Sequence, residues 1–333
     1  MATSETATKT CTWAEIQDHG GPEVIRWPNG KIPRPGPGEV LIEHTAIGLN
    51  FIDTYHRSGL YPVDLPSGLG LEAAGRIMAL GSGVSGYAEG DRVAYMGPGL
   101  GAYATHRVMP ASALFKLPDA ISDEVAAAST LKAATVEFLV ERCARVSAGD
   151  TVVVHAAAGG VGQILVQWLR AIGAHAIGTV SSAEKEELAY KAGCDHVIRY
   201  DTNDVAAGVD ELTDGAGVPV VFDGVGKDTF KTSLDCLSPR GLLVSFGNAS
   251  GPVEGVNLGL LAQKGSLFVT RPTLFDYYAT PDDRDRGIGR VWEMLASESI
   301  EVTIGQTYPL LEAAQAHRDL EARKTTGSTI LLP

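Results

Sequence analysis

The stretch TVVVHAAAGGVGQILVQWLRAIG, residues 151–173, decides the fold. Its first five residues, 151–155, are mostly β-branched, which is typical of a strand buried in a parallel sheet. Three glycines then fall within residues 159–162, and an apolar segment of helical length, residues 161–172, ends at Gly173. The stretch therefore predicts a strand, a tight turn and a helix in direct succession.

The same alternation of strand and helix continues after residue 173. A capping-box pattern at Ser181 and Glu184 predicts the start of a second helix, which Gly193 ends. Short β-prone runs predict further strands at residues 175–180, 196–200, 218–223, 242–246 and 267–270. Strands that alternate with helices indicate an α/β fold with a doubly wound parallel sheet.

The pattern before this region is different, because residues 21–118 are predicted to be mostly β. Pro-Gly clusters and glycine turns separate short β-prone runs, which indicates a small barrel or sandwich. These runs are residues 24–25, 39–44, 75–80 and 92–95. The remaining predicted elements are helices at 122–131, 134–143, 286–296 and 310–321 and a last strand at 328–332.

Composition and charge narrow the class of protein. A chain of 333 residues suits two domains, and 44% hydrophobic with 20% charged residues is the balance of a globular protein. The net charge of −13 opposes broad contact with nucleic acid or anionic membranes, although a local basic pocket can still bind a small anion. The four cysteines lie far apart without a C-x-x-C pair, so neither a disulfide framework nor a structural zinc site is expected.

Targeting signals are not expected either. Residues 1–15 are polar and threonine-rich, without the basic start and apolar core of a secretory signal. The most apolar segment, residues 151–169, is interrupted by glycines, which a membrane span would not tolerate so readily. The sequence therefore predicts a cytoplasmic protein.

The glycine turn resembles a dinucleotide-binding fingerprint, G-x-G-x-x-G, with Ala157, Gly159 and Gly162 in the three slots. The second glycine lets the backbone approach a pyrophosphate, and the third permits close packing of helix on strand. The free N–H groups at a helix N-terminus attract that anion. Because a strand precedes this fingerprint and a helix follows it, we expect a dinucleotide site.

The end of the next strand indicates which dinucleotide binds. NAD sites place a carboxylate there for the ribose 2′-hydroxyl, whereas this chain has Ser181 and Ser182 after residue 180. A carboxylate would repel a 2′-phosphate, so its absence permits NADP. Lys185 and Tyr200 are placed to contact that phosphate, which predicts NADPH as the cofactor, although Lys185 alone could be a solvated helix residue.

Several runs of the chain resemble zinc-independent quinone oxidoreductases, the zeta-crystallin-like branch of the medium-chain dehydrogenase/reductase superfamily. They are GLNFIDTY at 48–55, AAAGGVG at 156–162, VSFGN at 244–248 and KGSL at 264–267. The resemblance extends from about Gly20 to Pro333. It implies a GroES-like, mostly-β catalytic domain formed by both chain ends, residues 1–131 and 272–333, and an NADPH-binding Rossmann domain at 132–271.

The resemblance also implies a set of cofactor contacts and a homodimer. The dimer would pair sheet edges of the cofactor domains near residues 267–270. The implied NADPH contacts are Asn50, Phe51, Tyr55, Thr135, Gly159, Gly160, Val161, Ser181, Lys185, Tyr200, Val225, Phe246, Gly247, Arg271 and Arg323.

No metal site is expected. Zinc alcohol dehydrogenases need a cysteine, a His-Glu pair and a further ligand around the catalytic metal. Here Asn50 occupies the region of the first ligand, and the His-Glu position has Leu71 and Glu72. Without a metal to polarise it, oxidation of an ordinary alcohol is disfavoured.

The activity implied by the resemblance is reduction of a small-molecule quinone by NADPH, through a hydride or single electrons. A quinone accepts a hydride readily, so positioning is the main catalytic requirement. We assign Tyr55 to orienting the substrate or relaying a proton, and Asn50 to a hydrogen bond with the cofactor or the substrate carbonyl. Aromatic packing is the alternative role for Tyr55. The alternative functions are an NADPH-dependent enal or enone reductase of the same superfamily and a non-enzymatic NADPH-binding protein.

Overall fold

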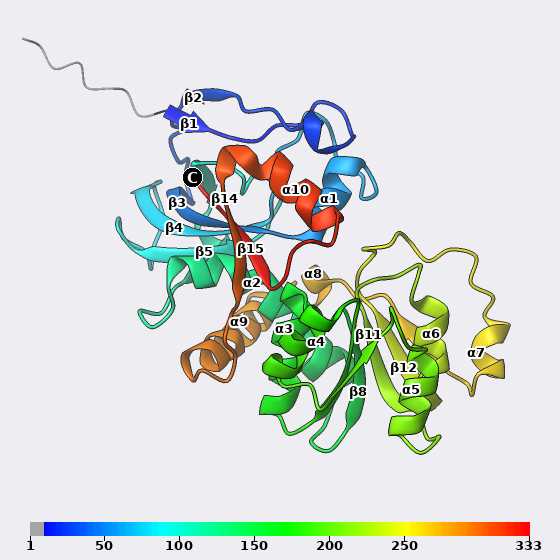
Figure 1. Ribbon diagram of the computed structural model, residues 1–333. Coiled ribbons are helices and arrows are strands. Elements are labelled where there is room, and N and C mark those ends of the chain that lie inside the picture. The colour runs from blue at the N-terminus through cyan, green and yellow to red at the C-terminus, as the bar shows by residue number, and fades with distance from the viewer. Residues whose placement is uncertain (1–9) are drawn as a thin grey trace, which may run out of the picture. The chain divides into compact units, whose positions relative to one another are not determined.

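The computed structural model describes residues 10–333 of the chain (Figure 1). Internal contacts divide it into two compact units. Unit 1 holds the chain up to Leu131 together with Ile304–Pro333, and unit 2 holds Lys132–Thr303. The expectation that residues 1–15 hold no secretory signal concerns mainly residues 1–9, which lie outside the described residues.

Unit 2 contains a six-stranded sheet in which every pair of neighbours is parallel. The strand order is β10-β9-β8-β11-β12-β13. The strands are β8 (Thr151–His155), β9 (His175–Val180), β10 (His196–Arg199), β11 (Val218–Asp223), β12 (Leu237–Ser245) and β13 (Phe268–Thr270). The order runs outward from β8 in both directions, so the prediction of a doubly wound parallel sheet is confirmed.

Helices cover both faces of this sheet (Figure 1). Crossovers between parallel strands are right-handed, so a reversal of direction at β8 puts the first and second pairs of helices on opposite faces. The first pair is α3 (Gly160–Ala171) with α4 (Ala183–Ala192), and the second is α5 (Val205–Leu212) with α6 (Phe230–Asp235). Buried Val153, Ile177 and Val221 of the strands pack in one core with residues of α5 and α6.

Unit 2 also includes residues 272–303, which the sequence assigned to the catalytic domain. They form α8 (Leu274–Tyr277) and α9 (Pro281–Ala296), and α7 (Gly259–Gln263) precedes them. Arg142 Nη1 donates to the carbonyl of Tyr277 at 2.7 Å, and Tyr278 Oη donates to Glu137 Oε2 at 2.8 Å. Because such bonds hold the segment within unit 2, the contact boundary lies at 303/304 rather than at 271/272.

Unit 1 is mostly β, as the sequence predicted. A seven-stranded sheet has the order β14-β15-β3-β4-β5-β7, with β6 paired to β3, and β1 and β2 form a separate pair. The strands are β1 (Thr10–Thr12), β2 (Asn29–Lys31), β3 (Glu39–Leu49), β4 (Glu72–Leu80), β5 (Arg92–Met96), β6 (His106–Pro110), β7 (Phe115–Lys116), β14 (Ile304–Pro309) and β15 (Ser328–Leu332). Strand β15 pairs with β3 and β14, so the sheet combines two distant parts of the chain.

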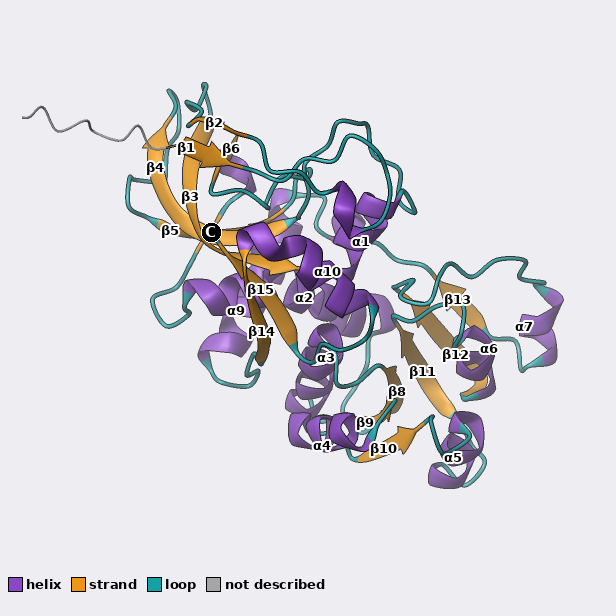
Figure 2. Cartoon of the chain, turned by 45° about the horizontal axis from the view of Figure 1, so that its top comes forward, coloured by secondary structure: helices purple, strands orange, loops and turns teal. Residues whose placement is uncertain are grey.

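Two helices of unit 1 lie side by side (Figure 2). Helix α1 (Phe51–Ser58) begins directly after β3, and α10 (Ala313–Glu321) precedes β15. Arg57 of α1 donates a hydrogen bond to His317 of α10, so side chains as well as backbone join the two helices.

Three local predictions were wrong. Residues 24–25 do not form a strand, because Pro22 starts the short 3-10 helix Pro22–Val24 there. The two helices predicted at 122–131 and 134–143 are continuous, as α2 (Asp123–Glu137) followed by a π-helical segment, Phe138–Ala144. No glycine or proline interrupts this stretch. The cap of α4 is Ser182, which accepts from the N–H of Lys185, rather than Ser181.

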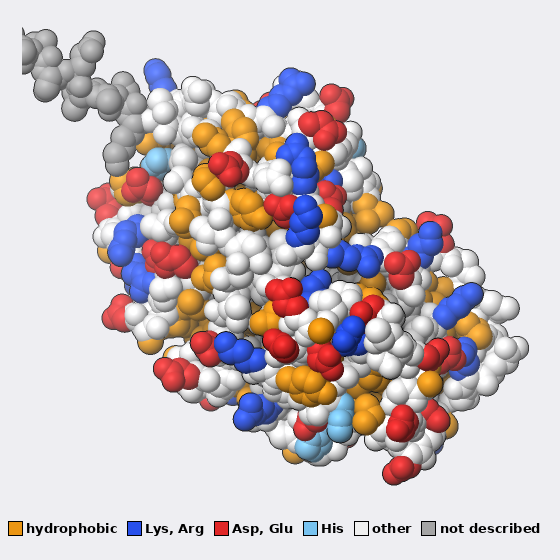
Figure 3. Space-filling view, viewed as in Figure 1, with side chains coloured by type: hydrophobic (Ala, Val, Ile, Leu, Met, Phe, Trp, Pro, Cys, Tyr) orange, Lys and Arg blue, Asp and Glu red, His pale blue; other side chains and the backbone are white. Residues whose placement is uncertain are grey.

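The surface and the helices agree with the charge and hydropathy of the sequence. Acidic and basic side chains are interspersed on the face shown in Figure 3, despite the net charge of −13. Within residues 10–333, no helix is both long and apolar enough to cross a bilayer.

Candidate active site

The glycine turn of unit 2 joins the carboxyl end of β8 to the start of α3. Ala156 has a φ of 54°, which turns the chain back after the strand. A Cβ at Gly162 would lie 2.3 Å from the carbonyl oxygen of Ala156, so this position requires glycine for α3 to pack on the turn. The first bond of the helix runs from the N–H of Gln163 to the carbonyl of Gly159, at 2.9 Å. The N–H groups of residues 160–162 therefore precede the intrahelical bonds and face outward for an anion.

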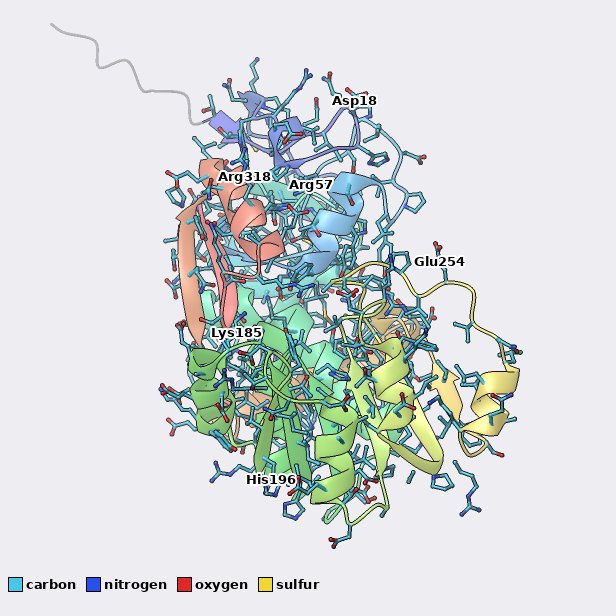
Figure 4. The ribbon with its side chains drawn as sticks, turned by 45° about the vertical axis from the view of Figure 1, so that its right-hand side comes forward. Asp18, Arg57, Lys185, His196, Glu254 and Arg318 are labelled. Carbon is cyan, nitrogen blue, oxygen red and sulfur yellow. The ribbon has the colours of Figure 1, made fainter. Side chains whose placement is uncertain are left out.

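Ser181, Lys185 and Tyr200 gather beside this turn. Ser181 directly follows β9, and the N–H of Tyr200 donates to the carbonyl of Val180, at 3.0 Å, which brings Tyr200 to the same strand end. Lys185 lies in the first turn of α4. Figure 4 shows Lys185 at the carboxyl end of the sheet and His196, which starts β10, at the opposite end. This edge carries hydroxyls and a lysine where an NAD site has a carboxylate.

The other half of the predicted set lies where β11, β12 and β13 end. The N–H of Phe246 donates to the carbonyl of Asp223, at 2.8 Å, beside Val225. Arg271 Nη1 donates to the carbonyl of Gly247, at 3.1 Å. Val225, Phe246, Gly247 and Arg271 therefore form one cluster at the carboxyl edge of the sheet, where open α/β sheets bind their ligands.

A buried polar network that the sequence did not reveal supports this edge. Asp223 is 1% exposed, and its Oδ1 accepts from the N–H groups of Val225, at 2.8 Å, and Gly226, at 3.0 Å. Its Oδ2 accepts from Ser233 Oγ at 2.8 Å, and Ser233 Oγ lies 3.0 Å from His155 Nε2. Since the hydroxyl of Ser233 gives its single proton to Asp223, His155 Nε2 must donate to the serine oxygen, and burial lowers the pKa of His155. The network fixes the loop that carries Val225.

Two further predicted residues belong to other elements of the chain. Thr135 is half-buried near the end of α2. Arg323, in unit 1, is exposed directly after α10, with a φ of 59°. No described contact tests the roles in cofactor binding predicted for Thr135 and Arg323, so these roles stay predictions.

Asn50, Phe51 and Tyr55 lie together in unit 1, where β3 passes into α1. Asn50 is the N-cap of the helix, and its N–H donates to Asp53 Oδ2 at 2.9 Å. The ring of Tyr55 lies between two other rings, with its centroid 6.2 Å from that of Phe51 and 5.1 Å from that of Tyr61. Tyr55 is 7% exposed, so aromatic packing holds its ring in one place.

Glu72 fixes the side chain of Asn50. Its Oε1 accepts from Asn50 Nδ2 at 2.7 Å, and its Oε2 accepts from the N–H of Leu131 at 2.6 Å. Glu72 is fully buried, and Gly48 makes room for it, since a Cβ there would lie 2.4 Å from Oε1. This bond commits one amide hydrogen of Asn50 and fixes the orientation of its side chain. The sequence signal was a single carboxylate in the apolar run LGLEAA, residues 69–74.

The two positions compared above with zinc ligands are in contact. Asn50 and Glu72 are hydrogen-bonded to each other. Within residues 10–333, no group of three or more His, Cys, Asp or Glu side chains is placed to hold a metal ion.

The fold and the site define a two-domain dehydrogenase. Residues 36–119 match the family described as alcohol dehydrogenase GroES-like domain. Residues 160–275 match the family described as zinc-binding dehydrogenase. The prediction of a GroES-like domain joined to a Rossmann domain is confirmed.

Full-length relatives identify the branch. The chain is 53% identical over 95% of its length to a quinone oxidoreductase of Pseudomonas aeruginosa, of which it covers 97%. It is 48% identical to Escherichia coli quinone oxidoreductase, solved in complex with NADPH, with a TM-score of 0.95 and coverage of 97% and 100% of the two chains. A 2-haloacrylate reductase from Burkholderia sp is 43% identical, with coverage of 96% and 98%. The chain belongs to the zinc-independent quinone oxidoreductase branch of the medium-chain dehydrogenase/reductase superfamily.

Proposed function

We propose that this chain is an NADPH:quinone oxidoreductase that reduces a small-molecule quinone without a metal. The observation that carries the proposal is the 53% identity, over 95% of the chain, to a quinone oxidoreductase. The carboxyl edge of unit 2 agrees with it, because the residues there suit a dinucleotide that bears an additional phosphate.

The residues present fit NADPH. The N–H groups of residues 160–162 suit the pyrophosphate, and Gly162 leaves no side chain between turn and helix. Ser181, Lys185 and Tyr200 suit the 2′-phosphate, since they offer hydroxyls and a positive charge and no carboxylate. When bound, NADPH supplies the hydride that the quinone accepts.

The chain's own contribution to the reaction is positioning. Asn50 presents an amide that Glu72 fixes, and Tyr55 presents a hydroxyl on a ring held by its aromatic neighbours. The buried carboxylates of Glu72 and Asp53 accept hydrogen bonds and thereby orient the donors around them. We assign proton delivery to Tyr55 or to solvent, because the hydroquinone oxygens need no strong acid.

An acceptor panel tests the activity. We expect NADPH oxidation by the purified chain, followed by absorbance, to be fast with 1,4-benzoquinone and slow with 2-chloroacrylate or an enone. The 2-haloacrylate reductase relative makes reduction of an activated C=C bond the second candidate. Faster turnover with 2-chloroacrylate than with any quinone would establish that candidate instead. Binding of NADPH without turnover on any acceptor would indicate a non-enzymatic protein.

Lys185→Ala tests the cofactor assignment. Loss of a charge-assisted hydrogen bond costs about 1.5–3 kcal/mol, so KM for NADPH should rise roughly 10- to 150-fold. KM for NADH should barely change. Lys191→Ala removes another lysine of α4 and is the matched control, which should behave as wild type. Equal losses for both dinucleotides would contradict the assignment.

We propose that the chain is a homodimer paired through β13. This strand is the edge of the unit 2 sheet, and its Phe268 and Val269 are 61% and 39% exposed. An apolar edge strand is a template for pairing with a second copy. Phe268→Asp should convert the dimer to a monomer in light scattering, whereas Leu212→Asp, at an exposed apolar residue of α5, should not. A wild-type monomer at micromolar concentration would refute the pairing.

We also propose a cytoplasmic location, which the cysteines support. All four, Cys11, Cys143, Cys194 and Cys236, are free thiols. Unpaired buried thiols are typical of proteins in a reducing compartment. Fractionation of the native host should recover the protein with cytoplasmic markers, and recovery outside the cytoplasm would overturn the assignment.

A further inference from the structure

A network of buried hydrogen bonds in unit 1 leaves α1 at Arg57, passes through His317 of α10 and Tyr103, and returns to α1 at Asp53. Arg57 Nη1 bonds to His317 Nδ1 at 3.0 Å, His317 Nε2 to Tyr103 Oη at 3.0 Å, and Tyr103 Oη to Asp53 Oδ2 at 2.9 Å. Asp53, Tyr103 and His317 are 0% exposed, and Arg57 is 2% exposed. Figure 4 labels Arg57, which extends from α1 beside α10.

The hydrogen bonds of this network all donate in one direction, from Arg57 towards Asp53. The Arg57 guanidinium has only donors, so Nδ1 of His317 must accept and Nε2 must carry the proton. His317 therefore donates to the Tyr103 oxygen, and Tyr103 donates its own proton to the carboxylate of Asp53. Burial lowers the pKa of His317 to about 3, which keeps the ring in this neutral form at neutral pH.

The network ends at Asp53, which also bonds to the backbone at the start of α1. The same oxygen of Asp53, Oδ2, accepts from the backbone N–H of Asn50 at 2.9 Å. Asn50 is the N-cap of α1, and Tyr55 lies one turn further along the helix. The other end of the network is fixed as well, because Arg57 forms a bidentate pair with Glu321 at 2.6 and 3.1 Å. The network thus links the Arg57–Glu321 pair to the backbone at Asn50.

Stability alone is a weak reason for such a network. A buried ion pair gives little net stabilisation over apolar residues of the same volume, because the charges lose their hydration. The network instead gives each of its side chains a single orientation, because its donors and acceptors face one another. It restrains the entry to α1, which carries both residues that we assign to the reaction.

We propose that Tyr103 and His317 are positioning residues for hydride transfer, which hold Asn50 and Tyr55 in place through Asp53. The inference rests on the proposed function, because it assumes that these two residues contact substrate or cofactor. Neither Tyr103 nor His317 is expected to touch the reacting atoms.

Tyr103→Phe tests the inference against a matched control. Tyr95→Phe removes the same hydroxyl from another fully buried Tyr–His pair of unit 1, in which Tyr95 Oη lies 2.9 Å from His44 Nε2. We expect both variants to show a similar fall in melting temperature. Only Tyr103→Phe should lower kcat, by about tenfold, with KM for NADPH within twofold of wild type. His317→Gln keeps a donor and an acceptor and should retain more kcat than His317→Phe.

A combined variant shows whether Tyr103 acts through Asn50 and Tyr55. Adding Tyr103→Phe to the pair Asn50→Ala and Tyr55→Phe should lower kcat no further, because both groups being positioned are already missing. Multiplied losses, or equal kcat in Tyr103→Phe and wild type, would overturn the inference while leaving the proposed function intact. Absence of turnover in the wild type would instead refute the proposed function, and the inference with it. If Tyr103→Phe fails to fold, the comparison of His317→Gln with His317→Phe decides, and equal kcat in those two overturns the inference.

Discussion

The buried carboxylate of Glu72 can be exchanged for an amide with almost no change of shape. It accepts two charge-assisted bonds, from Asn50 Nδ2 at 2.7 Å and from the N–H of Leu131 at 2.6 Å. Each such bond contributes about 1.5–3 kcal/mol, against about 0.5–1.5 kcal/mol for a neutral one. Glu72→Gln therefore loses about 2 kcal/mol from the two bonds, of which removal of a buried charge restores part. We expect it to lower the free energy of unfolding by about 1 kcal/mol.

Glu72→Ala removes both acceptors and should be more damaging. It removes the carboxylate that two buried donors bond to, which costs about 1–3 kcal/mol for each bond, and it leaves a cavity in addition. The expected loss in the free energy of unfolding is therefore about 2–6 kcal/mol before the cavity is counted.

Glu72→Gln should also rotate the side-chain amide of Asn50 by half a turn, so that its oxygen and nitrogen exchange places. The introduced side chain has one acceptor oxygen, and the N–H of Leu131 requires it, since that backbone donor cannot turn. The introduced NH₂ group then faces Asn50, which must rotate so that Oδ1 accepts. Nδ2 and Oδ1 of Asn50 thus exchange places, which changes the polar group that Asn50 offers to the reactants. We expect kcat with NADPH and benzoquinone to fall about tenfold, equivalent to about 1.4 kcal/mol in the barrier.

Urea unfolding and steady-state kinetics on the same samples check both effects. Asp91→Asn is the control, because Asp91 is a surface carboxylate paired with Lys116 at 3.0 Å, where such pairs contribute little. Wild-type turnover in Glu72→Gln would refute the orienting role. Equal stability of the alanine and glutamine variants would refute the hydrogen-bond account.

Three other changes have defined outcomes. Burial lowers the pKa of His44 to about 4 and that of His317 to about 3, so unfolding takes up protons below pH 6.5 and the stability present above that pH is lost on acidification. Each of the two histidines should lower the free energy of unfolding by roughly 2 kcal/mol at pH 5. Urea midpoints that do not change between pH 7.5 and pH 5 would contradict this expectation. Gly162→Ala should lower stability by about 1–3 kcal/mol and weaken NADPH binding in calorimetry, because its Cβ would meet a backbone oxygen at 2.3 Å, whereas Gly289→Ala, with open space around it, should not. Tyr55→Phe should lower kcat roughly tenfold if the hydroxyl donates, and unchanged kinetics would leave only the ring's packing role.

Much of unit 2 could be predicted because its signals are local. A buried parallel strand is a short β-branched run, and a glycine or a capping residue marks the helix beside it. The strands at 175–180 and 218–223 were therefore predicted with the bounds of β9 and β11. In unit 1 the sequence placed strand 39–44 correctly but missed its extension to Leu49, since residues 45–49 are mostly buried and lack the alternation of a half-buried strand.

The supporting residues of the site were harder to predict. The relation of Asn50 to Asp53 is local, an acid three residues after an N-cap, and a search for capping pairs would have found it. Tyr103 and His317 are 214 residues apart, and each alone resembles an ordinary core side chain. Only the fold brings them together, so no pattern in the sequence could predict their contact. The same holds for residues 272–303, whose place in unit 2 depends on bonds from Arg142 and Glu137.

The position of β15 has a consequence for synthesis of the chain. This strand lies between β14 and β3 within its sheet, yet its residues, Ser328–Leu332, are translated after all of Lys132–Thr303. During translation residues 47–49 of β3, which pair with β15, stay uncovered until β15 emerges from the ribosome, while every strand of the other unit has already emerged. A nascent β edge is a template for wrong pairing, so the interval before release is when the growing polypeptide most needs a chaperone.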